Sequence, residues 1–271
     1  MDRYVVAGNP VSHSLSPDIH AHFAASVGEN IEYGRLLVPQ GEFASHLARF
    51  FEDGGSGANV TLPFKVDAFE FATASSARAQ RAGAANFLLR RGNVIECDNT
   101  DGVGLVADLT RNLGVVLAGA RILLLGAGGA ARGVIAPLLA EGPSALLIAN
   151  RTQAKASELA RSFDDLGAVE ACALDAIGET GADLVINATS SSTRGESLAL
   201  PAGTLGKGVF AYDMAYGASA KPFVARATDA GARASDGLGM LVEQAAESYF
   251  LWRGKRPATS AVLAELRSRF A

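Results

Sequence analysis

The sequence predicts an α/β protein of two domains, and three observations support this fold class. The chain has 271 residues, which corresponds to about two domains of typical size. Short apolar runs rich in β-branched residues alternate with stretches whose apolar residues recur at helical spacing, as in βαβ units. Near the middle of the chain, a glycine-rich turn follows a buried strand and opens a helix, which is typical of a doubly wound parallel sheet.

The composition excludes several classes of protein. Apolar residues make up 49% of the chain and charged residues 19%, so a folded core is expected. The net charge is -4 and no basic block is present, which argues against a nucleic-acid partner. Two cysteines are too few for a disulfide framework or a cysteine-built metal site and fit a reducing cytoplasm. The sequence contains no apolar stretch of a signal peptide near its start and no run of about 18 apolar residues. Neither export nor membrane spanning is therefore expected.

The first hundred residues are expected to form a mixed α/β domain. Ile19, Phe23 and Val27 give a first helix one apolar face. Phe43, Leu47 and Phe50 recur at helical spacing and indicate a second helix. The expected elements are a strand at 4–7, a helix capped by Ser16 with Pro17 at its first position, a strand at 36–38, the second helix ending before Gly54, a strand at 58–62, and a hairpin of 86–90 with 94–97.

The rest of the chain is expected to form a second domain before returning to the first. The expected elements are a linking helix over 103–109, strands at 122–125, 146–149, 184–187 and 209–212, helices after the glycine turn and from about 154, and a final helix pair after 237–239. The final pair is expected to return to the first domain. The predicted domains are therefore 1–101 plus 238–271, and 102–237.

The glycine turn is a candidate dinucleotide site. It consists of Gly126, Ala127, Gly128, Gly129 and Ala130. Glycines let the backbone approach a pyrophosphate, and the start of the following helix offers unpaired N–H donors. The alternative is a tight turn that binds nothing, which the complete βαβ context disfavours.

A basic segment about twenty residues further on indicates which dinucleotide would bind. It contains Asn150, Arg151, Thr152 and Lys155, and no acid stands there to hold a ribose diol. A guanidinium, a hydroxyl and an ammonium suit a ribose 2′-phosphate, so NADP is favoured over NAD. The alternative is an ordinary basic helix start, although positive charge there opposes the helix dipole.

A row of serines is a candidate carboxylate site. Ser12, Ser14 and Ser16 alternate with other residues, so an extended segment would place the three hydroxyls on one face. The alternative assigns Ser16 to helix capping and the other two to solvent.

Lys65 and Asp101 are candidates for proton transfer. Lys65 follows the strand at 58–62, and open α/β sheets bind ligands beyond the carboxyl ends of their strands. Its neighbours in the sequence are apolar, and an amine partly shielded from water with an aspartate nearby is suited to proton transfer. Asp101, at the predicted domain junction, is the candidate partner. A surface lysine and a capping aspartate are the alternative.

Taken together, these motifs resemble shikimate dehydrogenase, of the shikimate/quinate dehydrogenase family. The matching segments are Ser14-Leu15-Ser16-Pro17, Asn59-Val60-Thr61-Leu62-Pro63-Phe64-Lys65, Asp98-Asn99-Thr100-Asp101-Gly102, Gly126-Ala127-Gly128-Gly129-Ala130, Asn150-Arg151-Thr152, Asn187-Ala188-Thr189-Ser190, Tyr212-Asp213-Met214 and Asp236-Gly237-Leu238-Gly239-Met240-Leu241. The resemblance extends over nearly the whole chain.

The resemblance implies an NADP-linked oxidoreductase that interconverts shikimate and 3-dehydroshikimate in aromatic amino-acid biosynthesis. It implies a substrate domain, a Rossmann NADP-binding domain, an active site in the cleft between them, no metal, and a monomer or homodimer. The implied roles are proton transfer by Lys65 with Asp101; substrate binding by Ser14, Ser16, Thr61, Asn86, Asp101, Tyr216 and Gln244; and cofactor binding by 126–130, Asn150, Arg151, Thr152, Lys155, Met214 and Gly237.

Several positions depart from the common family pattern, so further readings stay open. Phe87 replaces a small hydroxyl residue, Cys97 a glycine, and 191–194 a frequent Gly-Met. The alternatives are a relative acting on quinate or another hydroxylated cyclohexane carboxylate, with altered or weak activity, and a non-catalytic NADP-dependent sensor. Retention of Lys65 and Asp101 disfavours the sensor. A folate-pathway dehydrogenase is a more distant alternative, because it does not explain the serine row.

Overall fold

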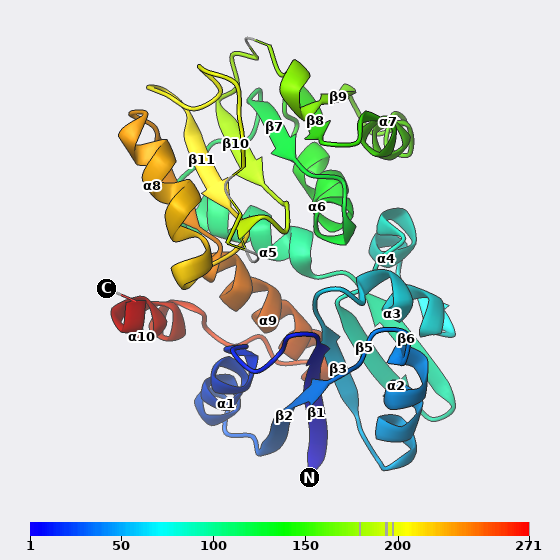
Figure 1. Cartoon of the computed structure of the whole chain (residues 1–271). Helices are drawn as coiled ribbons and strands as arrows, with labels where there is room; N and C mark the ends of the chain where they lie inside the picture. Colours follow the sequence, from blue (N-terminus) through cyan, green and yellow to red (C-terminus); the bar gives the residue numbers. More distant parts are fainter. Residues whose placement is uncertain (179, 193–194, 197, 271) are drawn as a thin grey trace. The chain divides into compact units, whose positions relative to one another are not determined.

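The computed structural model describes residues 1–178, 180–192, 195–196 and 198–270 (Figure 1). The chain forms two compact units, which we call unit 1 (Met1–Gly104 and Leu241–Arg269) and unit 2 (Leu105–Met240). Each unit is built on its own six-stranded sheet, so the predicted α/β class is confirmed. Within the described residues, no helix combines the length and apolar character that crossing a membrane requires.

Unit 1 contains a mixed sheet with the order β2-β1-β3-β5-β6-β4. Its strands are β1 (Asp2–Gly8), β2 (Ile31–Leu37), β3 (Gly57–Val60), β4 (Ala74–Ser75), β5 (Phe87–Arg91) and β6 (Val94–Asp98). β1 pairs in parallel with β2 and β3, whereas β5 is antiparallel to β3 and β6. The predicted hairpin of 86–90 with 94–97 is confirmed as β5 and β6.

The helices that begin in unit 1 are α1 (Ser16–Ser26), α2 (Phe43–Glu52), α3 (Lys65–Phe71), α4 (Ala77–Ala82), α5 (Asp101–Ala107) and α10 (Ser260–Phe270). α9 (Leu238–Arg253) begins in unit 2 and enters unit 1 at Leu241. α2 buries Phe43, Leu47 and Phe51, so Phe51 rather than the predicted Phe50 completes its buried stripe. In α1, the predicted Ser16 cap is wrong: the helix starts at Ser16 without a side-chain cap.

Unit 2 contains a fully parallel sheet with the order β12-β11-β10-β7-β8-β9. Its strands are β7 (Arg121–Leu125), β8 (Ala145–Asn150), β9 (Val169–Ala173), β10 (Leu184–Asn187), β11 (Phe210–Asp213) and β12 (Arg233–Asp236). The strand order reverses between β7 and β10, which makes this a doubly wound sheet. In such sheets, ligands bind beyond the carboxyl ends of the strands at the reversal point.

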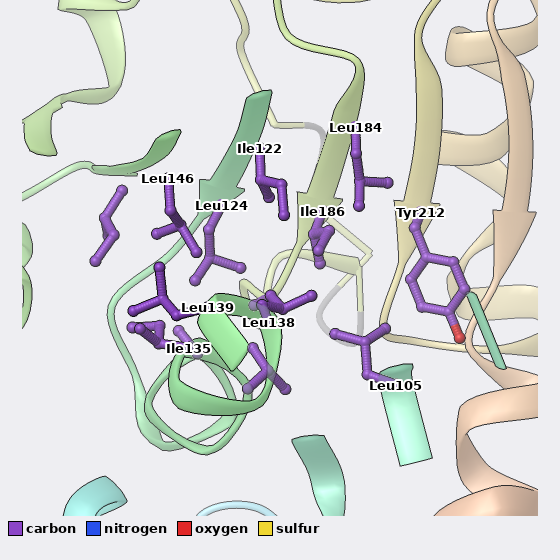
Figure 2. Close-up of a cluster of buried hydrophobic side chains, with 14 of the residues drawn as sticks. Leu105, Ile122, Leu124, Ile135, Leu138, Leu139, Leu146, Leu184, Ile186 and Tyr212 are labelled. Atoms are coloured by element: carbon purple, nitrogen blue, oxygen red, sulfur yellow. The ribbon is translucent and has the colours of Figure 1, made fainter. Parts of the chain in front are cut away.

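Both faces of this sheet are buried. The helices of unit 2 are the π-helical turn Asp108–Asn112, α6 (Gly129–Ala140), α7 (Gln153–Arg161), α8 (Lys221–Asp229) and the 3₁₀ turns Leu174–Ala176 and Gly217–Ser219. Figure 2 shows Ile122 and Leu124 of β7 beside Ile135 and Leu138 of α6 in one cluster. A second cluster joins Leu123 of the same strand to α8 and β11. Burial on both faces explains why β7 is a continuous apolar run.

Candidate active site

The first part of the candidate site is an ion pair inside unit 1. Lys65 is the first residue of α3 and Asp101 the first residue of α5. The Lys65 Nζ lies 2.5 Å from the Asp101 Oδ2, and the two side chains are 13% and 7% exposed. The structure therefore brings together the two predicted proton-transfer residues, and it shields the pair from most solvent.

A buried amide holds the other oxygen of Asp101. The Asn86 Nδ2 donates to the Asp101 Oδ1 over 2.9 Å and lies within hydrogen-bond distance of the Thr100 Oγ1 (2.9 Å) and the Gln244 Oε1 (3.2 Å). The Asn86 Oδ1 accepts from the Thr100 backbone N–H over 2.7 Å. Asp101 is thus fixed from two sides, by an amine on Oδ2 and an amide on Oδ1. Asn86, Asp101 and Gln244, all predicted site residues, form one cluster.

The predicted serine row is only partly correct. Residues 12 and 13 form a turn, and the Ser14 backbone N–H donates to the Val11 carbonyl over 3.1 Å, so the segment is not extended. Ser12 is exposed in that turn. The Ser14 and Ser16 hydroxyls nevertheless lie 3.2 Å apart, because helix α1 begins between them and brings the two side chains together. Two small neutral donors therefore remain as a candidate carboxylate site.

A chain of buried polar groups that the sequence analysis missed links these serines to Asn86. The Tyr33 hydroxyl interacts with Ser16 and donates to the Asn59 Oδ1 over 2.7 Å. The Asn59 Nδ2 donates to the Asn86 carbonyl and to the Ser248 hydroxyl. Burial raises the pKa of Tyr33 well above its ordinary value, so the phenol stays protonated. An asparagine inside the buried strand β3 was the available sequence signal, because buried amides need partners.

Thr61 follows β3 and lies close to the end of β1. Its backbone N–H donates to the Ala7 carbonyl over 2.9 Å. A Cβ on Gly8 would lie 2.4 Å from the Thr61 Cγ2, so only glycine fits beside this threonine. Gly8 is a further residue that the sequence analysis missed.

Phe87 does not line this cluster. Its ring stacks on Trp252, with ring centroids 5.2 Å apart, in a buried cluster that includes Tyr4 and Leu89. Successive side chains of a strand point to opposite faces, so Phe87 turns away where Asn86 turns toward Asp101. Cys97, the other departure in unit 1, is buried in the core, and burial raises the pKa of its thiol to about 11.

In unit 2, the glycine turn lies at the reversal point of the sheet. β7 ends at Leu125 and α6 begins at Gly129, so 126–128 form a tight connection. Gly126 has φ +108°, and a Cβ there would lie 3.1 Å from the Ala188 carbonyl oxygen. The first N–H groups of α6 lack intrahelical acceptors and form the kind of cradle that binds pyrophosphates. Ala127, Gly128, Gly129 and Ala130 belong to this connection and the first turn of α6.

The predicted 2′-phosphate site lies at the start of α7. Asn150 ends β8, and its Nδ2 donates to the Thr152 carbonyl over 3.0 Å. Thr152 is the N-cap residue, without a side-chain capping bond. Arg151 and Lys155 are exposed, and neither forms an ion pair with any residue that the structure describes. Two unneutralised cations therefore stand at a strand end adjacent to the glycine turn, since β8 pairs with β7.

Met214 and Gly237 lie together at the ends of β11 and β12. The Gly237 backbone N–H donates to the Ala215 carbonyl over 2.8 Å, and a Cβ on Gly237 would lie 2.5 Å from the Met214 carbonyl oxygen. The Met214 backbone N–H donates to the Asn187 carbonyl over 3.0 Å. The turns after β7, β10, β11 and β12 therefore contact one another along one edge. Tyr216, two residues beyond Met214, is partly exposed in unit 2.

The doubly wound sheet with its glycine turn, together with a shielded lysine–aspartate pair in a mixed α/β unit, defines the class of two-unit α/β dehydrogenases. Three family models match: "Shikimate dehydrogenase substrate binding domain" over residues 6–88, "Shikimate / quinate 5-dehydrogenase" over 108–195 and "Shikimate 5'-dehydrogenase C-terminal domain" over 237–267.

Individual relatives agree with these matches. A protein of Dechloromonas aromatica named "Shikimate dehydrogenase (NADP(+))" is 53% identical, covering 99% of this chain and 98% of the relative. A crystal structure of an Ael1 enzyme from Pseudomonas putida has TM-score 0.91 and 44% identity, covering 98% of each chain. The Thermus thermophilus shikimate 5-dehydrogenase in complex with NADP(H) and shikimate has TM-score 0.85 and 32% identity, covering 99% of each. The chain belongs to the shikimate dehydrogenase family.

Proposed function

We propose that this protein catalyses the NADP-dependent interconversion of shikimate and 3-dehydroshikimate, a step of aromatic amino-acid biosynthesis. The observation that carries this proposal is the contact of Lys65 with Asp101, whose other oxygen is held by Asn86. A proton-transferring pair of this kind is what the oxidation of an alcohol requires. The names of the relatives and the ligands of the Thermus thermophilus structure support the same activity.

The residues of unit 2 fit NADP. A side chain on Gly126 would meet the Ala188 carbonyl and the Thr189 side chain, so glycine lets the turn of the pyrophosphate cradle pack closely against this segment. Arg151 and Lys155 suit the 2′-phosphate. Met214 and Gly237, at the ends of β11 and β12, would contact the nicotinamide. When bound, NADP supplies the hydride acceptor at its nicotinamide.

The polar groups of unit 1 fit a hydroxylated carboxylate. Ser14 and Ser16 would hold the carboxylate, with Thr61, Asn86 and Gln244 on the ring hydroxyls and Tyr216 adding a contact. The Asn86 Nδ2 has three acceptor atoms within reach but only two hydrogens. The Thr100 hydroxyl also lies within reach of the Gln244 Oε1 (3.4 Å), so these buried donors and acceptors pair with one another and hold Asn86 and Gln244 in place.

In the oxidation direction, the reacting carbon gives up its hydrogen as hydride while its hydroxyl loses a proton to the Lys65–Asp101 pair. The Lys65 Nζ stabilises the developing alkoxide and takes part in the proton exchange. Asp101 orients Lys65 through its Oδ2, and Asn86 keeps the carboxylate in place. Lys65 and Asp101 act as one proton-holding unit, so the proton belongs to the pair. Reduction returns the proton to the carbonyl oxygen by the same route.

The alternative functions predict different activities with shikimate and quinate and with the two cofactors. Purified protein is assayed by absorbance of reduced nicotinamide, with shikimate and quinate crossed against NADP and NAD. Saturable reduction with shikimate and NADP is the expected result, and the orientation of Phe87 away from Asn86 supports it. Faster turnover of quinate would favour the quinate-acting relative, and NADP binding without turnover would favour a sensor.

We further propose a small-molecule enzyme of the cytoplasm, monomeric or homodimeric, without a nucleic-acid or membrane partner. Both cysteines are free thiols, which suits a reducing compartment. Light scattering on the purified protein measures the mass. A mass of about one or two chains is expected, and a tetramer would contradict this part of the proposal.

A further inference from the structure

The carboxyl ends of β10 and β11 carry a buried carboxylate that the mechanism does not use. Asp213 is fully buried. Its Oδ2 accepts hydrogen bonds from the Ser192 hydroxyl (2.6 Å) and the Asn187 Nδ2 (3.0 Å), and its Oδ1 accepts one from the Ala215 backbone N–H (2.9 Å). Burial raises the pKa of Asp213, and these three donors act in the opposite direction. The hydrogen bonds are therefore what keeps a carboxylate tolerable in this interior.

These hydrogen bonds connect the turn after β10 with the turn after β11, both in the candidate cofactor site. Ser192 ends the segment 188–192, whose other end packs against the glycine turn, where a Cβ on Gly126 would lie 3.1 Å from the Ala188 carbonyl oxygen. Asp213 is followed by Met214, whose carbonyl oxygen lies against Gly237. The Ser192–Asp213 bond thus connects the segment beside the pyrophosphate cradle with the strand end that carries Met214.

Ser192 is placed to act through this bond rather than by touching a ligand. The residue is 8% exposed, and its hydroxyl also accepts from the Asn187 Nδ2 over 3.0 Å. The Asn187 carbonyl in turn accepts the Met214 backbone N–H. Removing the Ser192 hydroxyl would leave the Asp213 Oδ2 with one donor, and the loss of a hydrogen bond to a buried charge is costly. Two further departures in this segment, Thr193 and Arg194, lie outside the described residues.

We infer that Ser192 is a positioning residue for the nicotinamide end of the cofactor site, because its hydroxyl holds the Asp213 carboxylate and thereby fixes Met214. This inference rests on the proposed use of NADP. Ser192 is expected to affect the binding of only one end of NADP. The 2′-phosphate end would bind to Arg151 and Lys155, after β8 and in α7, and does not depend on Ser192.

The test compares NADP with 2′,5′-ADP, which keeps the 2′-phosphate end and lacks the nicotinamide. Calorimetry measures both dissociation constants for wild type, Ser192→Ala and Ser192→Thr. In Ser192→Ala, the NADP constant is expected to rise about threefold to tenfold, because binding must then order the Met214 turn that the Ser192 hydroxyl holds in wild type, and the worth of that hydrogen bond sets the upper limit. The 2′,5′-ADP constant is expected to change less than about twofold, and Ser192→Thr, which keeps the hydroxyl, to restore most of the NADP affinity.

Ser144→Ala is the matched control, because its hydroxyl bonds the Ala120 carbonyl at the amino ends of the strands of the same sheet. It should leave both constants unchanged. Unchanged NADP affinity in Ser192→Ala, or equal losses for both ligands, would overturn the inference. Wild-type protein that binds NADP without oxidising shikimate would contradict the proposed function but leave this comparison intact.

Discussion

His20 is a neutral side chain inside an aromatic cluster of unit 1. Its ring stacks on Tyr33 with centroids 4.3 Å apart and lies 5.3 Å from the Trp252 ring. Burial lowers the pKa of His20 to about 3, from an ordinary value of 6.5. Between these two pH values the unfolded chain binds a proton that the folded protein does not. The contribution of His20 therefore makes the free energy of unfolding fall as the pH drops below 6.5.

His20→Phe, which keeps an aromatic ring in the cluster, is expected to reduce this acid sensitivity. The difference in unfolding free energy between pH 7 and pH 5 should be about 2 kcal/mol smaller than in wild type, at about 1.4 kcal/mol per pH unit. Urea unfolding at both pH values measures the difference. The exposed His13→Ala serves as control, and identical pH dependence in all three proteins would show that His20 is not the source.

Phe87 is expected to support the fold rather than choose the substrate. Phe87→Thr removes a buried ring that stacks on Trp252, so the free energy of unfolding should fall by about 2–4 kcal/mol. The ratio of shikimate to quinate turnover should stay within about twofold of wild type, because the ring faces away from Asn86. Urea unfolding and the substrate assay check the two halves. A changed ratio at unchanged stability would mean that the side chain reaches the substrate.

The start of helix α7 is expected to select the cofactor. Arg151→Ala removes one of two cations that no described carboxylate neutralises. The kcat/KM for NADP should fall at least about tenfold, whereas the kcat/KM for NAD should change little, because only NADP carries the 2′-phosphate. Steady-state kinetics with both cofactors measures this. Arg161→Ala at the other end of α7 is the control, and an equal loss with both cofactors would contradict the assignment.

The elements that the sequence predicted well are those with one dominant signal. The continuous apolar run of β10 and the turn-bounded hairpin of β5 and β6 are found where expected. β9 and β12 were missed, because these outer strands contain charged residues such as Glu170 and Arg233. β2 begins earlier than predicted, since Glu32 and Arg35 interrupt its apolar pattern. Edge strands face solvent, which removes the apolar signal on which the prediction depends.

In the candidate site, the residues could be predicted from the sequence, whereas the contacts among them depend on the fold of the whole chain. Motifs identified Lys65, Asp101, Asn86 and Gln244, but no local pattern gives the contacts among them, because Asn86 and Gln244 are 158 positions apart. The fold of unit 1 supplies those contacts through α9, which carries Gln244 to Asn86 at the start of β5. The buried chain through Asn59 was missed for the same reason: its partners come from separate strands and helices.

The central claim is that Lys65, held by Asp101, moves the substrate proton. The most direct test is the single-turnover rate of NADPH formation in Lys65→Met with shikimate and NADP both saturating. The rate in this variant is expected to be about 100- to 10,000-fold below that of wild type, because a positioned acid–base group usually contributes that much. The NADP dissociation constant should stay within about twofold, since Lys65 is in unit 1 and the candidate cofactor residues are in unit 2. A rate near that of wild type, with both ligands bound, would contradict the account.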